Sequence, residues 1–168
     1  MTIGKMIFHY TNGKALQGIL RTGNIEPRVS LMVPSGRPVV WLTSRAEWEQ
    51  TANVVMTHPD TLLPIPLSRA DTARTCGGLA RIRVPDEFPD FMRFGKLCRR
   101  ALIERSHAKA IARLGERLGS RPVDQWYGSL RPIPVAGLAI ELFWLGAWRN
   151  VNDVDPNGAM VPASEAFL

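Results

Sequence analysis

The chain has 168 residues, a formal net charge of +6 and a hydrophobic fraction of 45%, which is the profile of one globular domain. No apolar run approaches the ~18 residues of a membrane-spanning helix, and the first residues lack the apolar core of a secretory signal. Cys76 and Cys98 fit no metal-binding spacing and are expected to be reduced thiols. We therefore expect a cytoplasmic protein with no membrane contact and no metal.

Arginine dominates the basic residues. Of the 21 Lys+Arg, 17 are arginines and four are lysines, against 15 acidic residues. Arginine suits bidentate contact with phosphate, so the bias favours a nucleotide or nucleic-acid partner. A GC-rich genome produces the same bias without any function, and both explanations stay open here.

The first third of the chain predicts two strands around a short helix. Residues 5–10 are apolar and read as a strand, and residues 12–22 carry apolar side chains at helical spacing, with Gly23 as the C-cap. Residues 28–37 are rich in turn formers and predict a loop. The β-branched and aromatic run at residues 38–44 predicts a buried strand.

A helix and a long irregular segment are expected next. Ser44 is placed as an N-cap for a helix at residues 45–55, with Glu47 completing a capping box. Residues 58–78 contain three prolines and a Gly-Gly pair, and a structureless stretch of this length in a compact domain usually forms a functional loop or lid.

The rest of the chain alternates strands with one long helix. Residues 79–84 alternate apolar side chains with arginine, as a strand with one exposed face does. Residues 95–119 predict the longest helix, whose polar face is basic. Most such faces are only solvated, and the others bind phosphate or nucleic acid. Turn-rich residues 121–129 and extended residues 131–135 lead to the strongest late strand, at residues 138–144.

This order of few helices and several short strands predicts the α+β class. We expect one domain over residues 1–151 and a loose C-terminal tail over residues 152–168.

Polar and aromatic side chains stand where strands end, as a ligand cleft requires. Glu141 lies in the middle of the late strand, on the face opposite its two apolar neighbours. A carboxylate there is either solvent-facing or a rigidly held catalytic group. The first strand ends in an imidazole, an aromatic ring and a hydroxyl, and the second ends in an indole and two hydroxyls. We expect these groups to line a nucleotide cleft: His9, Tyr10, Thr11, Trp41, Thr43 and Ser44.

The motifs together resemble a group of small uncharacterised bacterial and phage proteins with an ADP-ribosyltransferase-like fold. The shared features are His-Tyr-Thr, a helix ending Ile-Leu-x-x-Gly-x-Ile-x-Pro, Val-Val-Trp-Leu-Thr-Ser, Gly-x-x-Pro-x-x-x-Trp, Pro-x-Pro and Ala-x-Glu, in the same order. The resemblance spans residues 8–149. It implies a split sheet with a nucleotide cleft, and NAD as the substrate.

The resemblance also implies residue roles. His9 would hold the adenosine-side ribose of NAD, and Glu141 would bind the nicotinamide ribose and stabilise its oxocarbenium-like transition state. Trp41 or Tyr10 would stack on a ring, and Thr43 or Ser44 would support the ribose or Glu141.

Two departures from that pattern keep other functions open. Ala139 stands two residues before Glu141, where better-known members carry Glu or Gln and select a protein acceptor. Trp41 stands where a tyrosine is usual. A related branch transfers RNA phosphate with arginines, a role that Arg81 and Arg83 could fill as nucleic-acid or phosphate contacts.

Three functions therefore compete. The first is an NAD-using ADP-ribosyltransferase, such as a toxin or phage-conflict effector, acting on an unknown protein or nucleic-acid acceptor. The second is an enzyme that processes an RNA 2′-phosphate or a nucleotide derivative. The third is a non-enzymatic nucleic-acid-binding module. A cleft that brings His9 and Glu141 together favours the first two.

Overall fold

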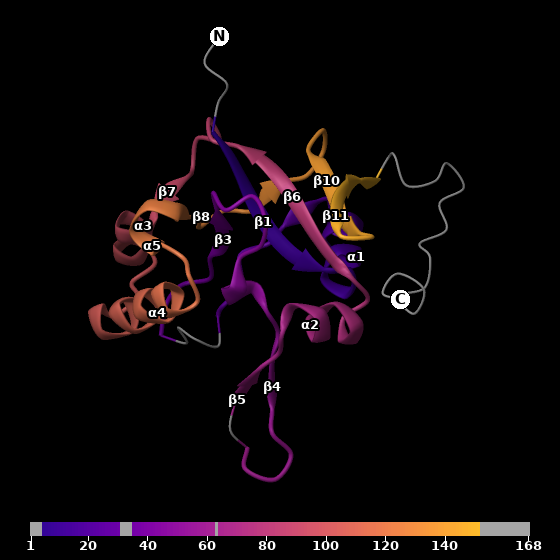
Figure 1. Ribbon diagram of the computed structural model, residues 1–168. Helices are drawn as coiled ribbons and strands as arrows, with labels where there is room; N and C mark the ends of the chain where they lie inside the picture. Colours follow the sequence, from indigo (N-terminus) through magenta and orange to yellow (C-terminus); the bar gives the residue numbers. More distant parts are fainter. Residues whose placement is uncertain (1–4, 31–34, 63, 152–168) are drawn as a thin grey trace.

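The fold of the chain is α+β and is built on one large antiparallel sheet (Figure 1). A computed structural model describes residues 5–30, 35–62 and 64–151. The seven strands of the sheet lie in the order β11-β10-β6-β1-β3-β8-β7. In chain order they are β1 (Met6–Asn12), β3 (Val40–Thr43), β6 (Leu79–Pro85), β7 (Met92–Arg93), β8 (Trp126–Ser129), β10 (Ala139–Trp144) and β11 (Ala147–Asn150).

Two small sheets and the helices complete the described part. β2 (Asn24–Ile25) pairs with β9 (Ile133–Pro134), and β4 (Val55–Thr57) pairs with β5 (Pro64–Pro66) in a hairpin that projects from the body (Figure 1). The helices are α1 (Gly13–Thr22), η1 (Gln50–Ala52, a 3₁₀ turn), α2 (Arg69–Thr75), α3 (Phe94–Arg100), α4 (Arg105–Arg117) and α5 (Pro122–Gln125). None of these helices has the length and apolar character needed to cross a bilayer.

Alternation along β1 divides the core between the two faces of the sheet. Ile7 belongs to a cluster with Leu16 and Ile19 of α1, whereas Phe8 and Tyr10 pack on the other face with Trp48. A third cluster joins α3 and α4 to β3 and β8. Cys76 and Cys98 are both buried and free, and burial raises the pKa of the Cys98 thiol to about 11.

Several predicted elements are confirmed. The strands at 5–10, 38–44, 79–84 and 138–144 correspond to β1, β3, β6 and β10, and the helix at 12–22 corresponds to α1. Gly23 is its C-cap in the left-handed conformation (φ 74°), and its N–H donates to the carbonyl of Ile19. The expected tail at 152–168 lies outside the described residues.

The predicted helix at residues 45–55 is wrong, because tertiary contacts hold most of that segment in an irregular conformation. Only Gln50–Ala52 forms a 3₁₀ turn, and Glu49 just before it has extended backbone angles (φ −100°, ψ 109°). Ser44 caps no helix; its N–H donates to the carbonyl of Gln125. Trp48 is buried against Tyr10, with the two rings 4.9 Å apart.

The segments at 58–78 and 95–119 also differ from expectation. The first contains β5 and α2 instead of a structureless loop. The second is two helices, because Leu102 adopts a left-handed conformation (φ 56°) after α3. Bonds from Ile103 N–H to the Cys98 carbonyl and from Leu102 N–H to the Arg99 carbonyl close a Schellman-type end.

Candidate functional site

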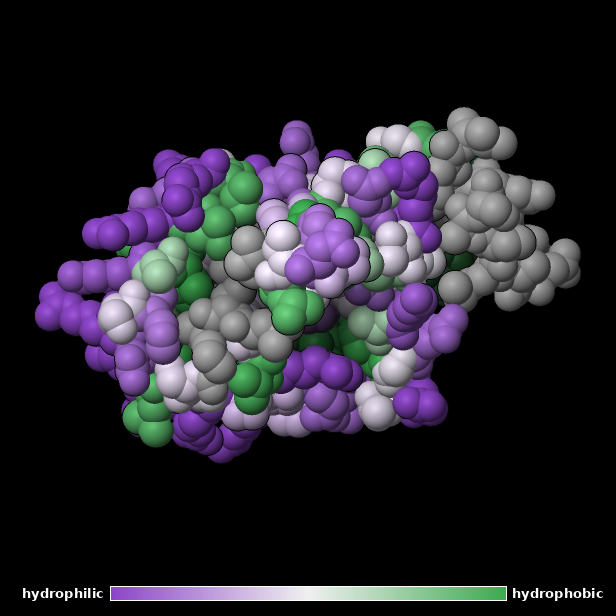
Figure 2. Space-filling model, turned by 90° about the horizontal axis from the view of Figure 1, so that it is seen from below, coloured by the Kyte–Doolittle hydropathy of each residue, from purple (hydrophilic) through white to green (hydrophobic). Residues whose placement is uncertain are grey.

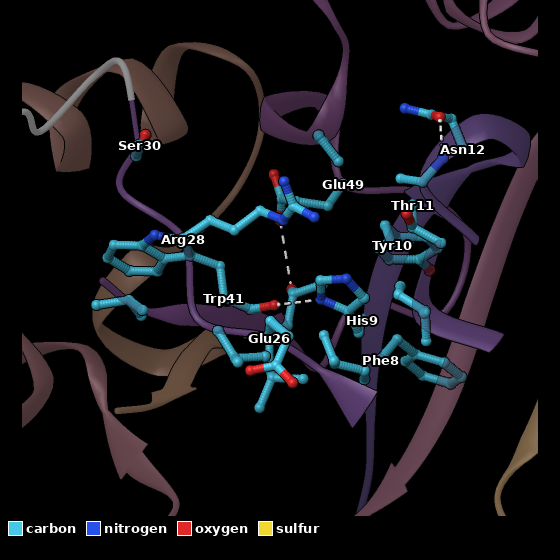
Figure 3. A pocket seen from close by; sticks show the side chains of 18 of the residues that line it. Phe8, His9, Tyr10, Thr11, Asn12, Glu26, Arg28, Ser30, Trp41 and Glu49 are labelled. Atoms are coloured by element: carbon cyan, nitrogen blue, oxygen red, sulfur yellow. Dashed lines mark hydrogen bonds between the residues drawn. The ribbon is translucent and has the colours of Figure 1, made fainter. Parts of the chain in front are cut away.

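A pocket of about 420 Å³ opens where β1, α1 and β3 meet (Figure 3). In the described residues β1 and β3 pair at a single position, Phe8 opposite Thr43. Toward the end of β1 the strands no longer pair, and side chains occupy the space between them. The volume suits a small-molecule site, for which roughly 300–1,000 Å³ is usual. The polar lining includes His9, Thr11, Arg28, Trp41, Thr43 and Glu49.

The His9 side chain connects β1 to β3 where the two strands form no backbone pair. Its Nδ1 lies 3.0 Å from the carbonyl oxygen of Trp41 (Figure 3). Because a carbonyl only accepts, Nδ1 carries the hydrogen and donates. Burial lowers the pKa of His9 below its ordinary value of 6.5, and the bond to Trp41 opposes this only in part. The ring is therefore neutral at pH 7, and Nε2 is a hydrogen-bond acceptor.

The lowered pKa of His9 predicts that stability depends on pH. The unfolded chain, with a histidine pKa near 6.5, binds more protons than the folded chain at mildly acid pH, so stability falls as pH drops below about 6.5. Urea unfolding between pH 8 and pH 5 measures the loss. His9→Gln keeps a donor toward Trp41 and removes the titration, so its profile should be flatter. If the stability of His9→Gln falls with pH as steeply as that of wild type, a group other than His9 causes the pH dependence.

Glu49 is the buried carboxylate of the pocket. It is 5% exposed and accepts hydrogen bonds at both oxygens. Oε1 accepts from the Ser120 hydroxyl (2.5 Å) and from the hydroxyl and N–H of Thr51 (3.0 and 3.3 Å). Oε2 accepts from Trp126 Nε1 (3.1 Å) and the Thr43 hydroxyl (3.3 Å). Two of these donors are N–H groups that cannot accept, so the arrangement fits the charged carboxylate.

The aromatic residues predicted to stack on a ligand differ in their surroundings. Tyr10 lines the pocket, but its hydroxyl donates to the Arg45 carbonyl (2.6 Å) and its ring packs on Trp48. Burial raises the pKa of Tyr10 to about 12. Trp41 is half-buried, and its ring lies edge-on to that of Trp126 at 6.2 Å. Trp41 is therefore the more available of the two.

The expectation that Glu141 joins His9 in one cleft is not met, because Glu141 is not among the residues that line the pocket. It lies two strands away on β10, where its Oε2 accepts from Arg81 Nε and its Oε1 lies 3.8 Å from Arg83 Nη1. In register, Tyr10 is opposite Arg81, and Arg81 is opposite Glu141. Arg81 therefore stands between the pocket residue Tyr10 and this carboxylate.

Arg81 and Arg83 were expected to contact phosphate on an exposed strand face. The Arg83 side chain is 40% exposed, as that expectation requires. The Arg81 side chain is only 11% exposed, and its guanidinium lies 4.6 Å from the rings of Phe8 and Trp148. β11, which was not predicted, is the edge strand next to β10 and supplies Trp148, whose ring packs on Arg81. Ser44 follows β3 but does not line the pocket.

Sequence reasoning missed several pocket residues, among them Arg21 and Trp126. Glu49 was hidden inside a segment read as helix, and Arg28 inside one read as loop. Ile111 brings α4 to the pocket wall. Only Glu49 had an available signal, as a carboxylate directly after Trp48 and close to the hydroxyls that end β3.

The described residues contain no cluster of His, Cys, Asp or Glu suited to a metal ion. In comparisons with known proteins, no family model, curated protein or solved structure matches this chain. Function must therefore be argued from the pocket.

Proposed function

We propose that the pocket binds a nucleotide, and that the chain is an NAD-using, ADP-ribosyltransferase-like protein. The observation that carries the proposal is the neutral His9 ring in the pocket. Its Nδ1–H is bonded to the Trp41 carbonyl, which leaves Nε2 to accept a hydrogen bond from a ligand hydroxyl. A ribose supplies such hydroxyls.

Two cationic side chains at the same pocket complement phosphate. Arg21 in the last turn of α1 and Arg28 after β2 both line it, and both are exposed. Figure 3 shows the Arg28 side chain extending over the pocket from its own strand-like segment, where Arg28 pairs with Val39. A guanidinium binds phosphate through paired N–H groups. The indole of Trp41 adds a flat surface for a base.

The junction of β1 and β3 supports the resemblance to the transferase fold. A split sheet with a nucleotide cleft requires two neighbouring strands that part, and these two pair only at Phe8 and Thr43 in the described residues. On this proposal NAD lies along that opening. The catalytic role of Glu141 stays a prediction.

The proposal predicts that wild-type protein binds NAD and that His9→Ala weakens the binding about tenfold. The variant loses the ring nitrogen that accepts from ribose, and one such hydrogen bond contributes roughly 1.4 kcal/mol. Isothermal titration with NAD measures both affinities. His58→Ala is the matched control, since His58 lies after β4 and outside the pocket. Equal affinities of wild type and His9→Ala for NAD would show that His9 does not contact the ribose. If the wild-type protein does not bind NAD, the proposed function is wrong.

A second candidate function, nucleic-acid binding, is favoured by the surface beside the pocket. α3 and α4 carry exposed basic side chains: Lys96, Arg99, Arg100, Arg105, Lys109, Arg113 and Arg117. Hydrophilic side chains gather at the left end of Figure 2, the end where α4 lies in Figure 1. Ile111 of α4 lines the pocket, whereas Lys109 and Arg113, two residues to either side, lie on the opposite and exposed face of the helix. A nucleic acid on this basic surface would therefore be separated from the nucleotide by α4.

This surface predicts salt-sensitive binding of nucleic acid. Each phosphate contact on duplex DNA contributes about −0.9 to the slope of log affinity against log salt. Fluorescence anisotropy with a labelled duplex and a labelled single strand, from 50 to 200 mM salt, measures that slope. Replacing Lys109 and Arg113 with glutamine should make this slope shallower by the contribution of about two phosphate contacts. An unchanged slope, or no binding at low salt, would show that the basic face is only solvated.

A further inference from the structure

We infer that the pocket distinguishes ligands by the charge of an aromatic ring, and that the Glu49 carboxylate makes it prefer a cationic ring. This inference rests on the proposed function, because it takes NAD⁺ as the ligand. It goes further by assigning to Glu49 the recognition of the positively charged nicotinamide ring.

The first observation is a buried negative charge that no salt bridge neutralises. Within residues 5–30, 35–62 and 64–151, the salt bridges found do not include Glu49. All of its five hydrogen-bond donors are neutral groups. Arg45 comes near Glu49 only through Ser120, whose hydroxyl accepts from Arg45 Nη1 (3.0 Å) while it donates to Glu49. That guanidinium weakens the negative charge without pairing with it, so the carboxylate still attracts a cation in the pocket.

Burial makes that attraction effective. Arg28 also lines the pocket, but it is exposed and solvent screens its charge, whereas Glu49 is 5% exposed. Charges interact more strongly where the local dielectric constant is lower. A ligand cation that enters from water therefore meets Glu49 as the less screened of the two charges.

The second observation is independent of Glu49: two indole rings share the same pocket lining. Trp41 and Trp126 both line it, with their rings 6.2 Å apart at 71°. The face of an indole attracts a cation through its quadrupole. Trp126 also donates its Nε1–H to Glu49 (3.1 Å), which places one of these rings directly beside the carboxylate. Both features favour a positively charged ring over a neutral one.

NAD⁺ and NADH test this difference, because they share ribose, phosphates and adenine and differ in the charge of the nicotinamide ring. Isothermal titration of wild-type protein with each should give NAD⁺ an affinity about tenfold higher. In Glu49→Gln the ratio of the two affinities should fall well below the wild-type ratio, leaving only the part that the indole rings of Trp41 and Trp126 contribute. Glu47→Gln, the same substitution on an exposed side chain outside the pocket, should keep the wild-type ratio.

The ratio is measured within each variant, so a general loss of affinity or stability does not change it. Glutamine leaves one obligate N–H donor, from Trp126 or Thr51, facing an amide NH₂, and this will destabilise the variant. The wild-type ratio alone tests the preference if the variant does not fold. Equal binding of NAD⁺ and NADH by wild type, or an unchanged ratio in folded Glu49→Gln, would overturn this inference. Neither result would contradict the proposal that the pocket binds a nucleotide. Binding of neither compound would overturn the proposed function as well.

Discussion

Replacing Gly13 with alanine is expected to lower the free energy of unfolding by about 3 kcal/mol, the upper part of the usual range for overpacking. A Cβ at this position would lie 2.7 Å from the carbonyl carbon of Gly77 and closer still to its oxygen. Both atoms belong to the backbone, so no side-chain rotation relieves the contact.

Hydrogen bonds prevent the two segments from moving apart. The N–H of Gly13 donates to the Gly78 carbonyl, and the N–H of Lys14 donates to the Cys76 carbonyl, each at 3.1 Å. Separation of the segments would break both bonds where α1 begins. Asn12, the N-cap of α1, accepts from Ala15 N–H at the same point, so the cap would be disturbed too.

Gly18→Ala is the matched control on the same helix. A Cβ there meets no atom within 4 Å, and alanine favours a helix interior over glycine by roughly 1 kcal/mol. Urea unfolding should therefore show Gly13→Ala destabilised and Gly18→Ala as stable as wild type or more stable. Wild-type stability for Gly13→Ala would show that the contact between α1 and the 76–78 turn is looser than described. α1 also lines the pocket, so Gly13→Ala should weaken NAD binding in parallel.

Four of the seven strands of the large sheet, β1, β3, β6 and β10, could be predicted because their patterns follow from local chemistry. The run Val40–Thr43 is β-branched and aromatic, and Leu79–Pro85 alternates buried and partly buried residues. Gly23 ends α1 because the left-handed conformation suits glycine. These signals lie within a few residues of one another, so a single sequence displays them.

The candidate site was predicted only in part, because its decisive contacts join distant segments. Glu49 receives bonds from Ser120 and Trp126, which are more than 70 residues away. A helix at 45–55 would satisfy local capping rules, but it could not hold this carboxylate at those donors. The split at Leu102 likewise depends on a backbone conformation that leucine rarely adopts. Pairing of Arg81 with Glu141 required knowing that β6 and β10 are neighbours.

Glu141 is where the sequence-based hypothesis and the described pocket differ most. The carboxylate is 9% exposed and fixed on a strand, and Arg81 orients one of its oxygens. Such a group is preorganised, as charge stabilisation requires. It is separated from the pocket by one strand, and the aligned positions of Tyr10, Arg81 and Glu141 form a row across β1, β6 and β10. The indoles of Trp48 and Trp148 pack on Tyr10, and Trp148 also packs on Arg81, so these rings would have to move before a ribose in the pocket could reach this row.

If NAD is cleaved with the help of Glu141, Glu141→Gln should reduce nicotinamide release by about 10²–10³, the usual cost of losing one preorganised electrostatic group. Glutamine keeps the size of the side chain and removes the charge that opposes the oxocarbenium, so NAD binding should be retained. Chromatographic detection of nicotinamide, with protein and nucleic-acid acceptors present, measures turnover. Titration with NAD measures binding, and circular dichroism at the assay temperature checks that the loss of the Arg81 pair has not unfolded the variant.

Glu47→Gln supplies the comparison for this assay, because it removes an exposed carboxylate outside the pocket and should keep wild-type turnover. If folded Glu141→Gln releases nicotinamide as fast as wild type, Glu141 has only a structural role, through its ion pairs with Arg81 and Arg83. The buried carboxylate of the pocket itself is Glu49, since Glu26, the other acidic residue in the lining, is exposed. A loss of turnover confined to Glu49→Gln would then assign the charge stabilisation to the carboxylate that Trp126 and Ser120 hold in place.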